Sequence, residues 1–285
     1  MSLTSNNLIG YMRAEFSKAA LLRKWLFGLQ LAAALPAAIS IVVPDTEKLL
    51  IYALAVAGGI LLAAWCTVNY FYVSARSAAN AARRGALLLG GLDQPLSTSE
   101  IQSLRRRFTV GSEQAKQFED PTYYATKQAP GPARLAEMVE ESAVYSEALH
   151  GISAHAMLGL LLLFSLIAVG VSLASTPYIT PDTAFVMVRI FLAALVFILS
   201  SDVLGAFMAH RAAANDIKEI LHRLMTADRA GYPLPDVLLA MTDYNAAIEG
   251  APEIVPFAYK VQRTRLDDRW KDYQSDREND RAARL

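Results

Sequence analysis

The chain has a single cysteine, Cys66, among its 285 residues, so it forms no internal disulfide and offers no cysteine cluster to a metal. It also lacks a net charge, because 27 basic residues balance 27 acidic ones. This balance leaves no bulk basic surface for nucleic acid and no acidic solvating tail. We therefore do not expect nucleic acid as a partner.

The common catalytic motifs are missing too. The sequence contains no glycine-rich phosphate loop and no HExxH, GxSxG or CxxC pattern. His150 and His155 are five residues apart, which does not place them on one helical face, and His210 and His222 are isolated in the chain. We expect no metal, no cofactor and no enzymatic activity.

What the chain has in abundance is long apolar sequence. About 20 helical residues cross a hydrocarbon core of about 30 Å. Core helices of a soluble protein would be interrupted by charges, and three of the four apolar stretches carry none. The sequence predicts an all-α membrane protein with four transmembrane helices, at 25–43, 49–73, 156–174 and 184–209.

The distribution of Lys and Arg sets the expected orientation. Basic residues gather before the first span and after the second and fourth, whereas the tips at 44–48 and 175–183 hold one lysine between them. We expect a multi-pass protein of the bacterial inner membrane with both termini cytoplasmic. The expected parts are a cytoplasmic N-terminal helix (1–24), a first transmembrane hairpin (25–73), a cytoplasmic helical segment (74–155), a second transmembrane hairpin (156–209) and a cytoplasmic helical tail (210–285).

Two similar hexapeptides follow the second and fourth apolar stretches, ARSAAN at 75–80 and HRAAAN at 210–215. Each marks the expected cytoplasmic exit of a hairpin. This agreement favours an internal duplication of one unit, a cytoplasmic helix followed by a hairpin and a second cytoplasmic helix. The alternative is that alanine-rich helix exits resemble one another by chance, since alanine is the best helix former.

The cytoplasmic segments carry helical patterns of their own. Residues 98–118 begin with a capping box in which Ser97 or Ser99 precedes Glu100. Further helices are expected at 133–151, running into the third span, and at 210–230, 235–250 and 257–281, with breaks at GYPLP and APEIVPF. We expect the two segments to pack together as a helical lobe.

Five arginines are candidate contacts for lipid or phosphate. Arg76 and Arg211 lie in the two hexapeptides, where a guanidinium meets lipid phosphates while its stem stays among apolar groups. Arg105, Arg106 and Arg107 form the densest basic cluster. The first interpretation of this cluster is a solvated helix face near anionic lipid, and the alternative is a phosphate or nucleotide contact.

Polar groups inside the apolar stretches are candidates for gating. Arg189 lies near the outer end of 184–209 and Asp202 near its inner end, 13 residues or roughly 20 Å of helix apart, so they cannot pair within one helix. Each either reaches its nearer membrane surface or faces a bundle interior with Gln30, Thr67 or Asn69.

Three longer stretches carry a resemblance to a known family: MRAEFSKAALLRKW, YYATKQAPGPARLAEMVEESAVYSEAL and YPLPDVLLAMTDYNAAIEGAPEIVPFAYKVQRTRLDDRW. They resemble the SMODS-associating four-transmembrane effectors of bacterial antiphage systems, and the duplicated hairpin is similar to the related SLATT effectors. The resemblance implies no catalytic residues. It implies action beside a nucleotidyltransferase whose cyclic oligonucleotide signals infection, with membrane damage as the output.

The expected function is thus a defence effector that oligomerises and permeabilises the inner membrane when a cytoplasmic signal, such as a cyclic nucleotide, arrives. Two alternatives stay open. The first is a membrane anchor or scaffold subunit for a soluble partner. The second is a small transporter, which is less favoured because the sequence lacks a polar cluster at the middle of the membrane.

Overall fold

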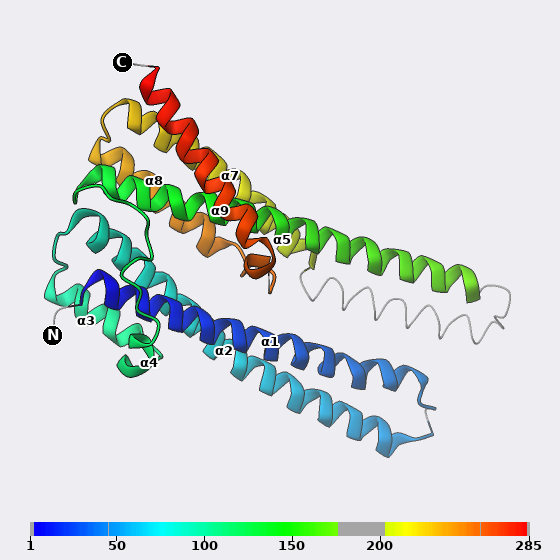
Figure 1. The fold of residues 1–285 in the computed structure, drawn as a ribbon. Helices are drawn as coiled ribbons and strands as arrows, with labels where there is room; N and C mark the ends of the chain where they lie inside the picture. The colour runs from blue at the N-terminus through cyan, green and yellow to red at the C-terminus, as the bar shows by residue number, and fades with distance from the viewer. Residues whose placement is uncertain (1–2, 45, 176–202, 257, 284–285) are drawn as a thin grey trace. The chain divides into compact units, whose positions relative to one another are not determined.

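The computed structural model describes residues 3–44, 46–175, 203–256 and 258–283, and these are helical with no strand among them. The predicted all-α fold class is therefore confirmed for the described residues (Figure 1). The helices are α1 (Ser5–Val42), α2 (Lys48–Leu92), α3 (Thr98–Arg107), α4 (Ser112–Lys116), α5 (Pro132–Ser175), α7 (Val203–Arg229), α8 (Leu234–Gly250) and α9 (Ala258–Ala282).

The chain divides into two compact units. The first, here called the lobe, comprises residues 1–19, 74–154 and 208–285, and the second, here called the apolar unit, comprises 20–73 and 155–207. Helices α1, α2 and α5 each supply residues to both units without a break in the helix. The lobe is thus assembled from three separate stretches of chain.

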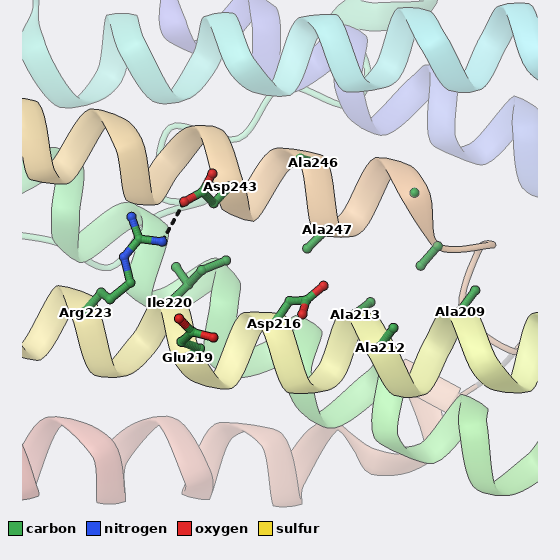
Figure 2. Close-up of a pocket in the computed structure, with 12 residues that line it drawn as sticks. Ala209, Ala212, Ala213, Asp216, Glu219, Ile220, Arg223, Asp243, Ala246 and Ala247 are labelled. Atoms are coloured by element: carbon green, nitrogen blue, oxygen red, sulfur yellow. Dashed lines mark hydrogen bonds and ion pairs between the residues drawn. The ribbon is translucent and has the colours of Figure 1, made fainter.

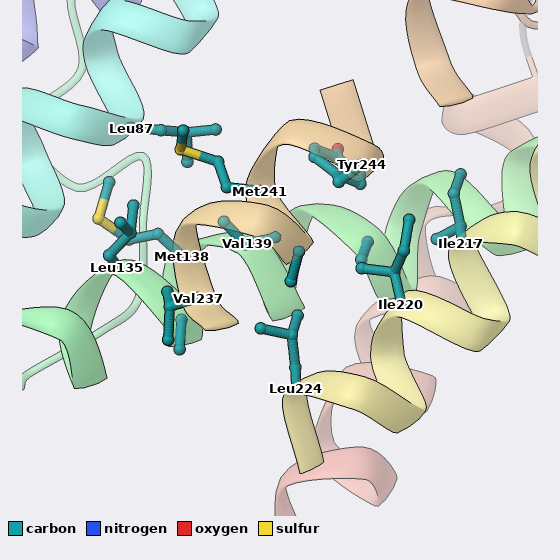
Figure 3. Close-up of a cluster of buried hydrophobic side chains, with 13 residues drawn as sticks. Leu87, Leu135, Met138, Val139, Ile217, Ile220, Leu224, Val237, Met241 and Tyr244 are labelled. Carbon is teal, nitrogen blue, oxygen red and sulfur yellow. The ribbon is translucent and has the colours of Figure 1, made fainter. Parts of the chain in front are cut away.

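The main core of the lobe lies where α2, α5, α7 and α8 meet (Figure 3). Leu87, Leu135, Ile217 and Leu224 are fully buried there, and Tyr244 is 2% exposed. Burying one such side chain contributes about 1.5–3 kcal/mol. This core packs segment 74–155 against segment 210–285, as the sequence predicted.

A second core joins α1, α2 and α3. Leu8 and Leu104 pack there against Ala82 and Ala86, whose small side chains let the helices approach closely. Ser97 is the N-cap of α3, and its hydroxyl accepts a hydrogen bond from the Glu100 amide. The predicted cap is confirmed at Ser97.

The sequence predicted where the helical pattern of 98–118 begins but not where a helix ends, and in the structure α3 ends at Arg107 and α4 begins at Ser112. The cause is the buried carboxylate of Glu15 on α1. It accepts hydrogen bonds from the backbone amides of Thr109 and Val110 and from the Thr109 hydroxyl. Because these amides donate to Glu15 of α1, they do not donate to the carbonyls four residues earlier, as a continuous helix would require.

The tail packs on α5. Gly231 and Tyr232 adopt positive φ angles of 76° and 59° at the predicted break between α7 and α8. The Tyr145 hydroxyl of α5 donates to Asp267 of α9 at 2.8 Å. A second α5–α9 contact is the 2.7 Å ion pair between Glu147 and Arg269. Both contacts hold α9 on α5.

The apolar unit has the opposite distribution of side chains. Trp25, Ile60 and Leu166 are 62%, 65% and 70% exposed, and most of the other exposed large hydrophobic side chains lie in the same unit. Among the described residues, two helices are long and apolar enough to cross a membrane, α2 and the Pro132–Ile167 part of α5. Most of the predicted fourth span, 184–209, lies outside the described residues.

Candidate functional site

Arg76 is held by the end of a neighbouring helix. Its Nη2 lies 3.3 Å and 3.2 Å from the carbonyl oxygens of Ile248 and Glu249, and it also donates to the carbonyl oxygen of Ala251. These carbonyls form the C-terminal end of α8, where the helix dipole favours a cation. The structure thus gives Arg76 protein partners, and its contact with lipid phosphates stays a prediction from the sequence.

Two further arginines extend this contact along α2. Arg84 forms a hydrogen-bonded ion pair with Glu249 at 2.6 Å. Arg83 is buried, donates through Nε to Asn245 at 3.2 Å, and lies over the ring of Tyr244. Together with Arg76 they fasten α8 to the stretch of α2 that directly follows the apolar sequence. No sequence pattern predicts this role, because the partners are more than 160 residues away along the chain.

The other predicted lipid or phosphate contacts are exposed. Arg105, Arg106 and Arg107 form the last turn of α3, where positive charge suits the helix dipole. Arg211 is exposed on α7, unlike Arg76, its counterpart in the first hexapeptide. Binding of lipid or phosphate by these four side chains stays a prediction from the sequence.

The structure describes two of the four candidate gating residues. Gln30 on α1 and Asn69 on α2 are half-buried within the apolar unit. Arg189 and Asp202 lie outside the described residues. Their contribution to a gate stays a prediction from the sequence.

A buried histidine pair joins α5 to α7, and sequence analysis missed it. His150 Nδ1 lies 2.9 Å from His210 Nδ1, and the side chains are 3% and 0% exposed. Burial, and then the charge of His210, lowers the pKa of His150 to about 4. The pair is 60 residues apart in the chain, so no local spacing pattern predicts it.

A buried ionic network fixes α9 to α5. Arg277 donates to Glu137 at 2.8 Å and also to Glu140, and all three side chains are buried. Burial raises the pKa of Glu140 to about 7. Such a network costs desolvation energy and depends on every partner being present. It makes the position of α9 specific.

The N-terminal motif that carries part of the family resemblance has a structural role. Arg13 donates to the Phe118 carbonyl at 3.0 Å and pairs with Asp120 at 3.3 Å. Lys18 donates to the carbonyl oxygen and the hydroxyl of Thr109. These contacts hold the chain around α4 against α1.

A groove of about 520 Å³ lies between α7 and α8 (Figure 2). Its lining combines small side chains, including Ala213 and Ala247, with the carboxylates of Asp216 and Glu219. A 2.6 Å ion pair between Arg223 and Asp243 spans the two helices at one end. The walls of the groove therefore consist largely of small side chains, and the groove carries a net negative charge.

Within the described residues, no three His, Cys, Asp or Glu side chains are placed to hold a metal ion together. The polar clusters of the lobe instead form contacts between helices, which fix α8 on α2 and α9 on α5. Comparison of the chain with protein-family models, curated proteins and solved structures found no match.

Proposed function

We propose that this chain is a multi-pass protein of the bacterial inner membrane whose lobe lies in the cytoplasm. The observation that carries this is the contrast between the two units. The lobe buries its apolar side chains in cores, whereas the apolar unit presents Trp25, Ile60 and Leu166 outward. Soluble proteins rarely expose continuous apolar surfaces of this kind.

The lipid bilayer is the occupant that fits this surface. The 18-residue window that marks α2 as a candidate span has none of its residues buried inside the protein. In water, each exposed apolar Å² costs about 25 cal/mol relative to an apolar environment. The proposed arrangement has four spans, at 25–43, 49–73, 156–174 and 184–209, as two duplicated hairpins.

Thiol labelling tests this orientation. In a Cys66→Ala background, Glu47→Cys and Thr180→Cys place one thiol at each expected hairpin tip. An impermeant reagent should label both in intact spheroplasts. Glu113→Cys, on exposed α4, is the control and should be labelled only after lysis. Labelling of residue 47 only after lysis would contradict the orientation.

We further propose that the protein is an effector without enzymatic activity, which oligomerises and permeabilises the inner membrane when a cytoplasmic signal arrives. The support is the resemblance of its three motif stretches to antiphage effectors, which suggests a cyclic oligonucleotide from a partner nucleotidyltransferase as the signal. The continuity of α1, α2 and α5 supports it physically. A signal bound by the lobe can act directly on helices that also build the apolar unit.

Dye release from liposomes tests this function. Purified protein is reconstituted into vesicles that contain a quenched dye, and cyclic di- and trinucleotides are added in turn. The expected result is release with one of them and none with linear nucleotides of the same bases. In cells, activation should depolarise the inner membrane and arrest growth. A well-expressed protein that never leaks dye or changes membrane potential is not an effector, and a membrane anchor for a soluble partner would then account for it better.

A further inference from the structure

The groove between α7 and α8 is chemically suited to a cationic side chain. Its lining holds three carboxylates and one guanidinium. Asp243 is neutralised by Arg223, whereas Asp216 and Glu219 are exposed and form no ion pair within the described part of the chain. Figure 2 shows Asp216 projecting from α7 into the space between the helices. An anionic lipid headgroup would be repelled here.

The small side chains that line the groove leave room for the end of another helix. Alanines at 209, 212 and 213 on α7 face alanines at 246 and 247 on α8. Such residues let a partner approach the backbone closely, and a volume of about 520 Å³ accommodates two long side chains. The expected occupant is therefore a narrow structure, such as the end of a helix, that carries positively charged side chains.

The same chain carries a matching element. The last turn of α3 presents three consecutive arginines, all exposed. Helix α9 is also charged and largely exposed, but its basic residues alternate with acidic ones. Several of these basic residues form ion pairs, such as Lys271 with Asp268 and Arg269 with Glu147. Among the described helices, only α3 ends in consecutive basic residues with no acidic residue between them.

This basic end cannot enter the groove of its own chain. Leu104 fixes α3 in the core that contains Ala82 and Ala86 of α2. The groove belongs to α7 and α8, which pack in the other core with Leu87 of the same helix. Helix α2 thus stands between the two surfaces, and contact requires two chains.

We propose that Arg106 and Arg107 of one copy insert into the α7–α8 groove of a second copy and pair with Asp216 and Glu219. Guanidinium groups match carboxylates with two parallel hydrogen bonds, which gives the contact direction as well as energy. The contact is heterologous, so repetition builds a ring or an open row of chains. The inference rests on the proposed function because it supplies that function's oligomerisation step.

Charge reversal tests the contact. Self-association of the full chain in lipid nanodiscs or detergent is measured by mass photometry for Arg106→Glu/Arg107→Glu and for Asp216→Arg/Glu219→Arg. Each pair of changes should weaken association at least about tenfold, or about 1.4 kcal/mol, and combining all four in one chain should restore it. Lys116→Glu/Lys127→Glu removes the same charge from exposed sites and should leave association unchanged.

A cross-link locates the contact. In a Cys66→Ala background, chains with Arg106→Cys mixed with chains with Asp216→Cys should form disulfide-linked dimers, whereas either variant alone should not. Unchanged association after both charge reversals overturns the inference. So does a loss of binding to anionic vesicles by the arginine variant with association intact, which would assign Arg106 and Arg107 to lipid.

Dye release measured on the same samples separates the two proposals. If wild-type protein releases dye and the charge-reversed chains release it equally well as monomers, this inference fails and the proposed function stands. If the cross-link forms but no cyclic nucleotide produces release, the contact stands and the effector function fails.

Discussion

His150 and His210 share one hydrogen bond between their Nδ1 atoms, 2.9 Å apart in the interior of the lobe. One ring must donate and the other accept, so the contact exists only while at least one ring is neutral. The guanidinium groups of Arg76 and Arg83 add positive charge nearby. A state in which both rings are positively charged is therefore unfavourable.

We expect the lobe to lose stability as the pH falls from about 6.5 to about 4. The pKa of His150 is lowered to about 4 by burial, whereas an unfolded histidine has a pKa of about 6.5. A lowered histidine pKa means that the unfolded chain binds more protons in this range, so stability is complete above 6.5 and falls with pH. The full loss is about 3 kcal/mol, measured by denaturant unfolding in detergent.

The double variant His150→Leu/His210→Leu isolates this effect. Glu140 titrates in the same range with the opposite sign, because its pKa is raised to about 7 by burial and its contribution grows as the pH falls. The difference between wild type and the double variant removes the Glu140 contribution. Equal pH dependence in the two proteins would contradict the prediction.

Arg76→Ala should destabilise the lobe far more than Arg211→Ala. Arg76 satisfies carbonyls at the end of α8, and losing a charged hydrogen-bond donor costs about 1.5–3 kcal/mol. Arg211 occupies the equivalent place in the second hexapeptide but is exposed, so its loss should cost under about 0.5 kcal/mol. Thermal unfolding in detergent micelles measures both. Similar shifts would show that the Arg76 contacts contribute little.

Gly10→Ala should displace α4 from α1. An added Cβ at this position would lie 2.5 Å from the Ala115 carbonyl oxygen, and relieving such a clash costs about 1–3 kcal/mol. Hydrogen exchange should accelerate at residues 112–120. Gly151→Ala is the matched control, because nothing lies within 4 Å of its added Cβ and the helix gains up to about 1 kcal/mol. Unchanged exchange at 112–120 would count against this packing.

Arg277→Met should release α9 from α5. It leaves two buried carboxylates without their cation, which costs about 3–5 kcal/mol, and adding Glu140→Gln should recover part of the loss. Arg269→Met removes a half-exposed partner of Glu147 and should cost under about 1 kcal/mol. Limited proteolysis of the tail reports both effects. Equal protease resistance of the two variants would argue against the network.

Local patterns were sufficient for much of the fold. Composition located the apolar stretches that lie in α2 and α5, and glycine and proline marked the break before α8. The cap of α3 was expected at Ser97 or Ser99, and the structure places it at Ser97. Each of these features depends on neighbours in the chain, so a sequence pattern records it.

The contacts that organise the lobe were not predictable in this way. Glu15 divides 98–118 into two helices from 94 residues away, and the partners of Arg76 lie at least 172 residues further along. The hexapeptides suggested equivalent roles for Arg76 and Arg211, yet only the first has the end of α8 beside it. A sequence shows a side chain that can donate, but the tertiary fold decides what accepts.

The assembly of the lobe from three separate stretches of chain has a consequence for its synthesis. Glu137 leaves the ribosome 140 residues before Arg277, and at about 5–20 residues per second this interval is roughly 7–28 s. During this interval the apolar stretches 156–174 and 184–209 emerge, while Glu137 and Glu140 of α5 still lack their cation. The α5–α9 network of the lobe can therefore close only after the last helix has been translated, which makes it a late contact of the nascent chain.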